Sequence, residues 1–146
     1  MAQFSDQYRA LGQIITQKLR DQSFAHYQQM KDFAKSMSAA EYRELERNPR
    51  LDPALQRLKD ERFELLNQLD NRQTEILDRL VLSVIDLTAF NFLREVEEHL
   101  DEEESIGLTI KGQKVEAITD EFLSGTLFGE YHQWVEEHSK YGSVQH

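Results

Sequence analysis

The chain has 146 residues, of which 39% are hydrophobic, 10% aromatic and 30% charged. That length is typical of a single domain with its own core. The absence of cysteine excludes disulfides, thiolate metal sites and cysteine nucleophiles, and it favours a reducing compartment. We expect one domain over residues 1–146, with a helical core over about 4–103 and an acidic lobe over about 104–142.

The formal net charge of −10 lies mostly in the C-terminal third. Residues 1–50 carry eight basic and six acidic side chains, residues 51–93 carry five and eight, and residues 94–146 carry four and thirteen, which leaves −9 in the last segment. A nucleic-acid partner would need a clustered basic face, and the sequence has none. The acidic segment predicts a basic protein partner, with a solubilising surface as the alternative.

The N-terminus lacks the basic and apolar regions of a secretory leader. The most apolar stretch, Leu80–Leu93, is shorter than the ~20 residues of a membrane span. These two features predict a cytoplasmic protein with no membrane partner.

The first third of the chain has the period of a helix. Apolar residues at steps of three and four predict helix over residues 4–37, either unbroken or with a break near 21–23. The Ser38–Glu41 pattern is a capping box, and it predicts a short helix from Ala39 to about Arg47.

A longer helical segment follows, beginning with a cap and a proline at Asp52–Pro53 and reaching about Glu103. It is either one rod or two helices with a break near Asp70–Asn71, and we favour the break. The break would fold residues 53–69 back on residues 75–100 as an antiparallel pair.

Leu80–Leu93 is apolar nearly all round, which predicts a helix surrounded by others at the centre of the fold. Asp86 and Asn91 interrupt it. A carboxylate in such a place needs a partner, which Arg79, Arg94 or the N-terminal helix could supply. Asp86 and Asn91 therefore indicate either a functional pocket or a structural hydrogen bond.

After the acidic residues 102–104, apolar residues occur at every second position, which is the spacing of a β-strand. Residues 106–110 and Val115–Ile118 read as two strands of a hairpin joined at residues 111–114. A final helix is expected from Glu130 to about Tyr141. The predicted fold is therefore mainly α: a helical bundle with long central antiparallel helices, a small C-terminal β-hairpin and a final helix.

Two pairs of residues have a spacing at which a metal could be held from one helix face. Glu95 and His99 are four residues apart, as are His132 and Glu136. Neither pair belongs to a recognised metal motif. We therefore expect these polar side chains to lie on helix surfaces without binding a metal, and we expect no cofactor.

Candidate partner-binding residues combine acidic side chains with aromatic ones, a composition found at protein interfaces. The aromatic members can equally attach the last helix to the core. The candidates are Glu95, Glu98, Asp101, Glu102, Glu103, Glu104, Phe128, Tyr131 and Trp134.

The sequence contains no phosphate-binding glycine loop and no nucleophile elbow. We therefore expect a non-enzymatic protein-binding module whose acidic third engages a basic partner. Toxin-neutralising immunity proteins and secretion chaperones have a similar composition, which is an analogy only. The alternatives are a self-assembling helical protein, dimeric through the central helices or the hairpin edge, and a metal-binding helical hydrolase.

Overall fold

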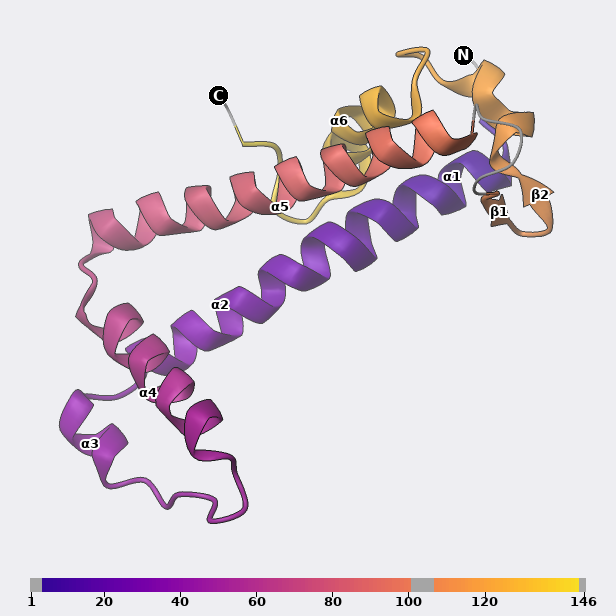
Figure 1. Cartoon of the computed structure of the whole chain (residues 1–146). Helices are drawn as coiled ribbons and strands as arrows, with labels where there is room; N and C mark the ends of the chain where they lie inside the picture. The colour runs from indigo at the N-terminus through magenta and orange to yellow at the C-terminus, as the bar shows by residue number, and fades with distance from the viewer. Residues whose placement is uncertain (1–3, 101–106, 145–146) are drawn as a thin grey trace. The chain divides into compact units, whose positions relative to one another are not determined.

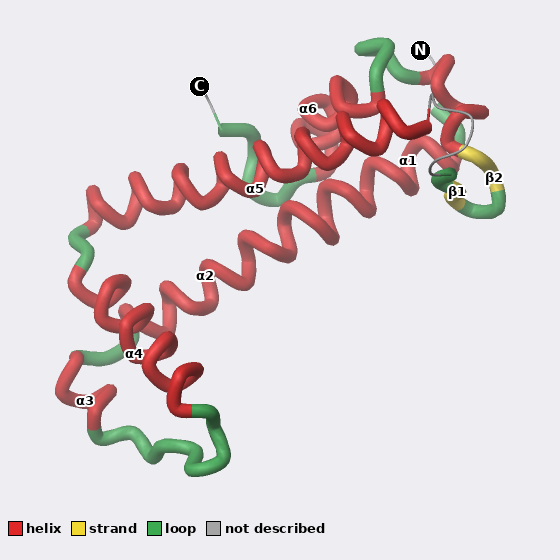
Figure 2. The backbone as a smooth tube through the Cα atoms, in the orientation of Figure 1, coloured by secondary structure: helices red, strands yellow, loops and turns green. Residues whose placement is uncertain are grey.

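A computed structural model describes residues 4–100 and 107–144 of the chain. It confirms a mainly α fold with a small two-stranded sheet and a final helix (Figures 1 and 2). The elements in chain order are α1 (Asp6–Gln13), the π-helix η1 (Ile14–Asp21), α2 (Gln22–Lys35), α3 (Ala39–Arg43), α4 (Pro53–Gln68), α5 (Asn71–Leu100), β1 (Thr109–Ile110), β2 (Gln113–Lys114), the 3-10 helix η2 (Val115–Glu121) and α6 (Leu127–His138).

The chain divides into two compact units. Unit 1 contains Met1–Phe24 and Val81–His146, and unit 2 contains Ala25–Leu80. The hairpin and α6 pack with the N-terminal helix inside unit 1.

The N-terminal region is continuous helix, one of the two possibilities that the sequence left open. Ser5 caps α1 by accepting a hydrogen bond from the Tyr8 amide. Helical hydrogen bonding then passes through η1 into α2 without an intervening loop, as the unbroken red tube in Figure 2 shows.

The core of unit 1 is built around the indole of Trp134, which is fully buried. Its ring centroid lies 5.5 Å from that of Tyr8 and 6.2 Å from that of Phe122, both in edge contacts. Gly12 lies directly against the indole. The remaining buried side chains of this core are Leu11, Ile15, Ala89, Leu93, Val115, Ile118, Leu127, Tyr131 and Val135.

The hairpin is shorter than predicted. Lys111 and Gly112 both have positive φ, 47° and 76°, as a two-residue type I′ turn requires. The prediction of a strand over Val115–Ile118 is wrong, since these residues begin η2. The three-residue period of that helix turns Val115 and Ile118 together into the core. Ile106 lies outside the described residues.

The prediction that Leu80–Leu93 is buried all round is also wrong. Its buried members are Leu82, Ala89 and Leu93. Leu80, Val84 and Leu87 are 55–60% exposed. An apolar run cannot distinguish a helix that is surrounded from one with two apolar faces, only one of which is covered.

In unit 2 the sequence signals for helix ends are confirmed. Ser38 and Glu41 form the predicted capping box, although α3 already ends at Arg43. Asp52 caps α4 through the Ala54 amide, with Pro53 at its first position. The long segment breaks as predicted, between Gln68 and Asn71.

The partners of α4 differ from those expected. Its Phe63 stacks on Tyr42 of α3, with centroids 3.8 Å apart, and meets Phe33 of α2 edge-on at 6.1 Å. Asn67 donates to the carbonyls of Ala34 and Met37. The helix that α5 meets here is α2.

Asp78 makes that contact between α5 and α2. Its carboxylate accepts from the Tyr27 hydroxyl and from Lys31 Nζ, each at 2.8 Å. Burial, together with the hydrogen bond to Asp78, raises the pKa of Tyr27 well above its usual value.

Gly12→Ala tests the packing of the core. A Cβ at residue 12 would lie 2.5 Å from Trp134 Cδ1, so we expect a loss of about 1–3 kcal/mol in the free energy of unfolding. Elsewhere in a helix the same change would stabilise by roughly 0.5–1 kcal/mol. Urea unfolding shows whether Gly12→Ala lowers or raises the free energy of unfolding.

Gly107→Ala is the matched control, because a Cβ there meets no atom within 4 Å. Equal stability of the two variants would contradict the close approach of helix and indole.

Candidate partner-binding surface

A buried ion pair joins the N-terminal helix to α5. Arg20 of η1 is fully buried and its Nε donates to Asp86 Oδ1 at 2.6 Å. The guanidinium also donates to Ser139 Oγ at 2.5 Å and to the Gly142 carbonyl at 2.6 Å. The partner foreseen for Asp86 thus comes from the N-terminal helix, and the arrangement is a structural hydrogen-bond network.

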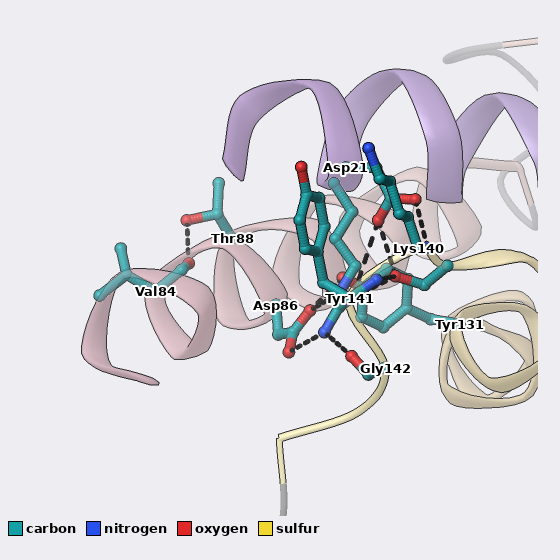
Figure 3. Close-up of polar contacts among 10 residues, drawn as sticks. Asp21, Val84, Asp86, Thr88, Tyr131, Lys140, Tyr141 and Gly142 are labelled. Carbon is teal, nitrogen blue, oxygen red and sulfur yellow. Dashed lines mark hydrogen bonds and ion pairs between the residues drawn. The ribbon is translucent and has the colours of Figure 1, made fainter. Parts of the chain in front are cut away.

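The segment after α6 is held by the same network, which Figure 3 shows around Asp86, Tyr131 and Gly142. The Tyr131 hydroxyl donates to Asp86 Oδ1 at 2.5 Å. Asp21 accepts from Ser139 Oγ at 2.7 Å and from the Lys140 amide at 2.8 Å. Burial and the Asp86 carboxylate raise the pKa of Tyr131 far above its usual value, so the phenol stays protonated and acts as a fixed donor.

Two further carboxylates fix α6. The buried Glu130 accepts from the Tyr8 hydroxyl at 2.5 Å and from the Ser124 amide at 2.7 Å. Glu97 of α5 accepts from the Leu127 amide at 2.6 Å, at the N-terminus of α6, where backbone donors lack helical partners. The orientation of α5 within unit 1 is therefore set by contacts along its length.

These contacts leave Val84 and Leu87, on the other side of α5, more than half exposed. At the edge of this exposed face, where α5 runs beside η1 and the start of α2, lies a shallow groove with a volume of about 320 Å³. The Thr88 hydroxyl donates back to the Val84 carbonyl at 2.7 Å, which satisfies it within the helix (Figure 3). The lining is therefore mostly apolar, and it consists of Leu19, Ser23, Val84, Ile85, Thr88 and Phe92.

The uncovered face, here called the outward face of α5, changes from apolar to acidic along the helix. Glu95 and Glu98 come eleven residues after Val84 and Leu87, about three turns, so all four side chains share this face. Both glutamates are exposed. Unit 1 as a whole carries seven basic and sixteen acidic side chains, a net −9.

The aromatic candidates lie elsewhere. Tyr131 and Trp134 are fully buried and offer no surface to a partner. They attach the last helix to the core, which is the alternative that the sequence left open. Phe128 is half-buried and its ring meets that of Phe90 edge-on at 5.2 Å. The acidic candidates Asp101, Glu102, Glu103 and Glu104 lie outside the described residues.

The residues considered for metal binding are all on helix surfaces. Glu95, His99, His132 and Glu136 are exposed. Over residues 4–100 and 107–144 there is no group of three or more His, Asp or Glu side chains placed to hold a metal ion. In the same residues, no helix has the length and apolar character needed to cross a membrane.

Sequence reasoning missed the groove and the buried arginine. The apolar residues of the outward face of α5 stand out in the sequence, but their pattern predicts burial. Arg20 had no comparable signal, because its neighbours Leu19 and Asp21 give no indication that a guanidinium turns inward at this position.

Comparison with protein-family models, with curated proteins and with solved structures finds no match to this chain.

Arg20→Met tests the buried ion pair. The variant removes the guanidinium from the Asp86 carboxylate, which keeps only the Tyr131 hydroxyl, and from the Gly142 carbonyl. We therefore expect a loss of about 3–5 kcal/mol in the free energy of unfolding by urea. Faster amide hydrogen exchange after residue 138 should accompany it.

Arg9→Met is the control, because its 4.0 Å ion pair with Asp6 is exposed and should contribute no more than about 1 kcal/mol. Similar losses of unfolding free energy in Arg20→Met and Arg9→Met would refute the conclusion that the buried ion pair stabilises unit 1.

The tyrosines provide a pH test. Burial and carboxylate acceptors raise the pKa of Tyr8, Tyr27 and Tyr131. A raised pKa in the folded state means that the associated stability is complete below the ordinary tyrosine pKa of about 10 and is lost as the pH rises above it. We expect near-ultraviolet absorbance to show these three phenols ionising only as the protein unfolds in alkali. Ionisation near pH ~10 with the fold intact would contradict their hydrogen bonding.

Proposed function

We propose that the chain is a non-enzymatic protein-binding module whose outward face of α5 binds a basic amphipathic helix of another protein. The observation that carries the proposal is the pattern on that face, apolar at Val84 and Leu87 and acidic at Glu95 and Glu98. In this interface the acidic third of the chain attracts the basic residues of the partner, and the groove accepts its apolar residues.

The apolar residues favour a helix as the occupant. The groove runs between two helical segments, η1 and α5, and grooves of this kind accept the apolar face of a third helix. Val84 and Phe92 are more than half exposed. Covering a half-exposed side chain of this size contributes about 1 kcal/mol, so several together can anchor a partner.

The charges favour a basic occupant. A helix lying along α5 with its apolar anchors against Val84 and Leu87 would place residues about three turns further on against Glu95 and Glu98. Lysine or arginine there would be attracted by the two glutamates and by the −9 of unit 1. Such attraction acts mainly on the association rate and weakens with salt.

Three synthetic peptides of equal length test this proposal directly. The first is a helix with leucines along one face and lysines at one end, the second has the same composition with its leucine face scrambled, and the third has glutamate in place of lysine. We expect measurable binding of the first alone, with an association rate that falls as ionic strength rises.

Val84→Glu should weaken binding of the first peptide about tenfold or more, because it places a carboxylate in the groove. Glu98→Lys should lower mainly the association rate. Leu58→Glu on α4 of unit 2 is the control, since Leu58 is 55% exposed and lies outside the groove. Equal binding of the scrambled peptide, or an unchanged affinity in Val84→Glu, would refute the proposal.

A second candidate is self-assembly through the outward face of α5. Val84, Leu87 and Phe92 are more than half exposed there. A second copy of the chain related by a twofold axis would cover these apolar side chains with the same face of its own α5.

The net −10 of each chain opposes such a pairing, which makes it the second choice. Sedimentation velocity of the chain alone decides: a dimer that dissociates in Val84→Glu and persists in the control Leu58→Glu would favour self-assembly. A monomer at all concentrations would exclude it.

A further inference from the structure

Unit 2 contains an open pocket of about 380 Å³ that the proposed function does not use. Its volume is within the range of small-molecule sites, about 300–1,000 Å³. It lies over the aromatic group where Phe63 of α4 meets Phe33 of α2 and Tyr42. Leu45 and Leu51, from the segment between α3 and α4, also line it.

The aromatic side chains under the apolar part of the pocket are held in place by their neighbours. Phe63 is buried and is held by stacking on Tyr42. The Tyr42 hydroxyl in turn donates to Asp60 at 2.8 Å, and Arg47 pairs with the same carboxylate at 2.8 Å. These interactions, with the Arg47 ion pair first, lower the pKa of Asp60 to about 2, so the carboxylate stays charged and the ring stays in place at neutral pH.

The charged part of the pocket is basic. Arg47, Lys59 and Arg62 line it, against the single acidic side chain Glu46. Arg47 is already neutralised by Asp60. Over the described residues neither Lys59 nor Arg62 forms an ion pair. Two cations that form no ion pair therefore lie beside the aromatic side chains of this pocket, in a chain of net charge −10.

We propose that this pocket binds a small anionic amphiphile, such as an alkyl or aryl carboxylate. The apolar body of the ligand lies on Phe33, Phe63 and Leu45, and its carboxylate is paired by Lys59 and Arg62. An apolar surface next to converging charged groups is the combination that such a ligand needs, and small-molecule sites commonly provide it. Glu46 opposes the ligand charge and so limits the affinity.

The test uses octanoate, octan-1-ol and octylammonium as probes, each titrated into the ¹⁵N-labelled chain and followed by NMR. Octanoate should shift amides of residues 30–33, 45–51 and 59–63, octan-1-ol should do so more weakly, and octylammonium should not bind there. Octanoate shifts confined to unit 1, equal binding of all three probes, or no octanoate shifts would overturn the proposal.

Charge variants on α4 provide the second readout. Lys59→Gln/Arg62→Gln should weaken octanoate binding about tenfold and leave octan-1-ol unchanged, because each partly exposed ion pair contributes at most a few-fold. Glu46→Gln should tighten octanoate binding. Arg57→Gln is the control, an exposed cation on the same helix that does not line the pocket. Equal weakening in Arg57→Gln and Lys59→Gln/Arg62→Gln would show only a response to net charge and would refute the pairing.

Discussion

The buried pair of Arg20 and Asp86 determines how unit 1 is organised. A fully buried guanidinium is tolerated only where its donors find acceptors, and here the carboxylate, a serine hydroxyl and a backbone carbonyl supply them. Because these acceptors come from α5 and from the segment after α6, one side chain joins three distant parts of the sequence. Tyr131 completes the set by donating to Asp86.

This constraint explains why one face of α5 is left open. The inward face must present Asp86, Ala89 and Leu93 to η1 and α6, so the opposite face points away from the core. That face nevertheless carries Val84 and Leu87, large apolar side chains that no described part of unit 1 covers. The proposed binding of a partner helix rests on this exposed apolar surface.

Local signals in the sequence predicted local structure well. The caps at Ser38 and Asp52, the break before Asn71 and the turn at Gly112 each depend on a few adjacent residues, and each was found. Tertiary features were predicted less well. Whether the apolar residues around Val84 face a core or a partner depends on which other helices arrive there, and the period of one helix does not contain that information.

The candidate site shows the same division. The exposure of Glu95 and Glu98 followed from their charge, whereas the burial of Tyr131 and Trp134 depends on α6 packing against α1 and η1. The inward turn of Arg20 depends on Asp86, which is 66 residues away in the chain. A contact at that separation leaves no trace in the spacing of neighbouring residues.

The most direct test of the proposed interface is a residue-resolved NMR map of the ¹⁵N-labelled chain titrated with the basic amphipathic peptide. We expect shifts that concentrate on the outward face of α5, from Val84 through Thr88 and Phe92 to Glu95 and Glu98, with smaller ones at Leu19 and Ser23 of the facing helices. Shifts confined to unit 2, or spread evenly over the acidic surface without the groove, would contradict it.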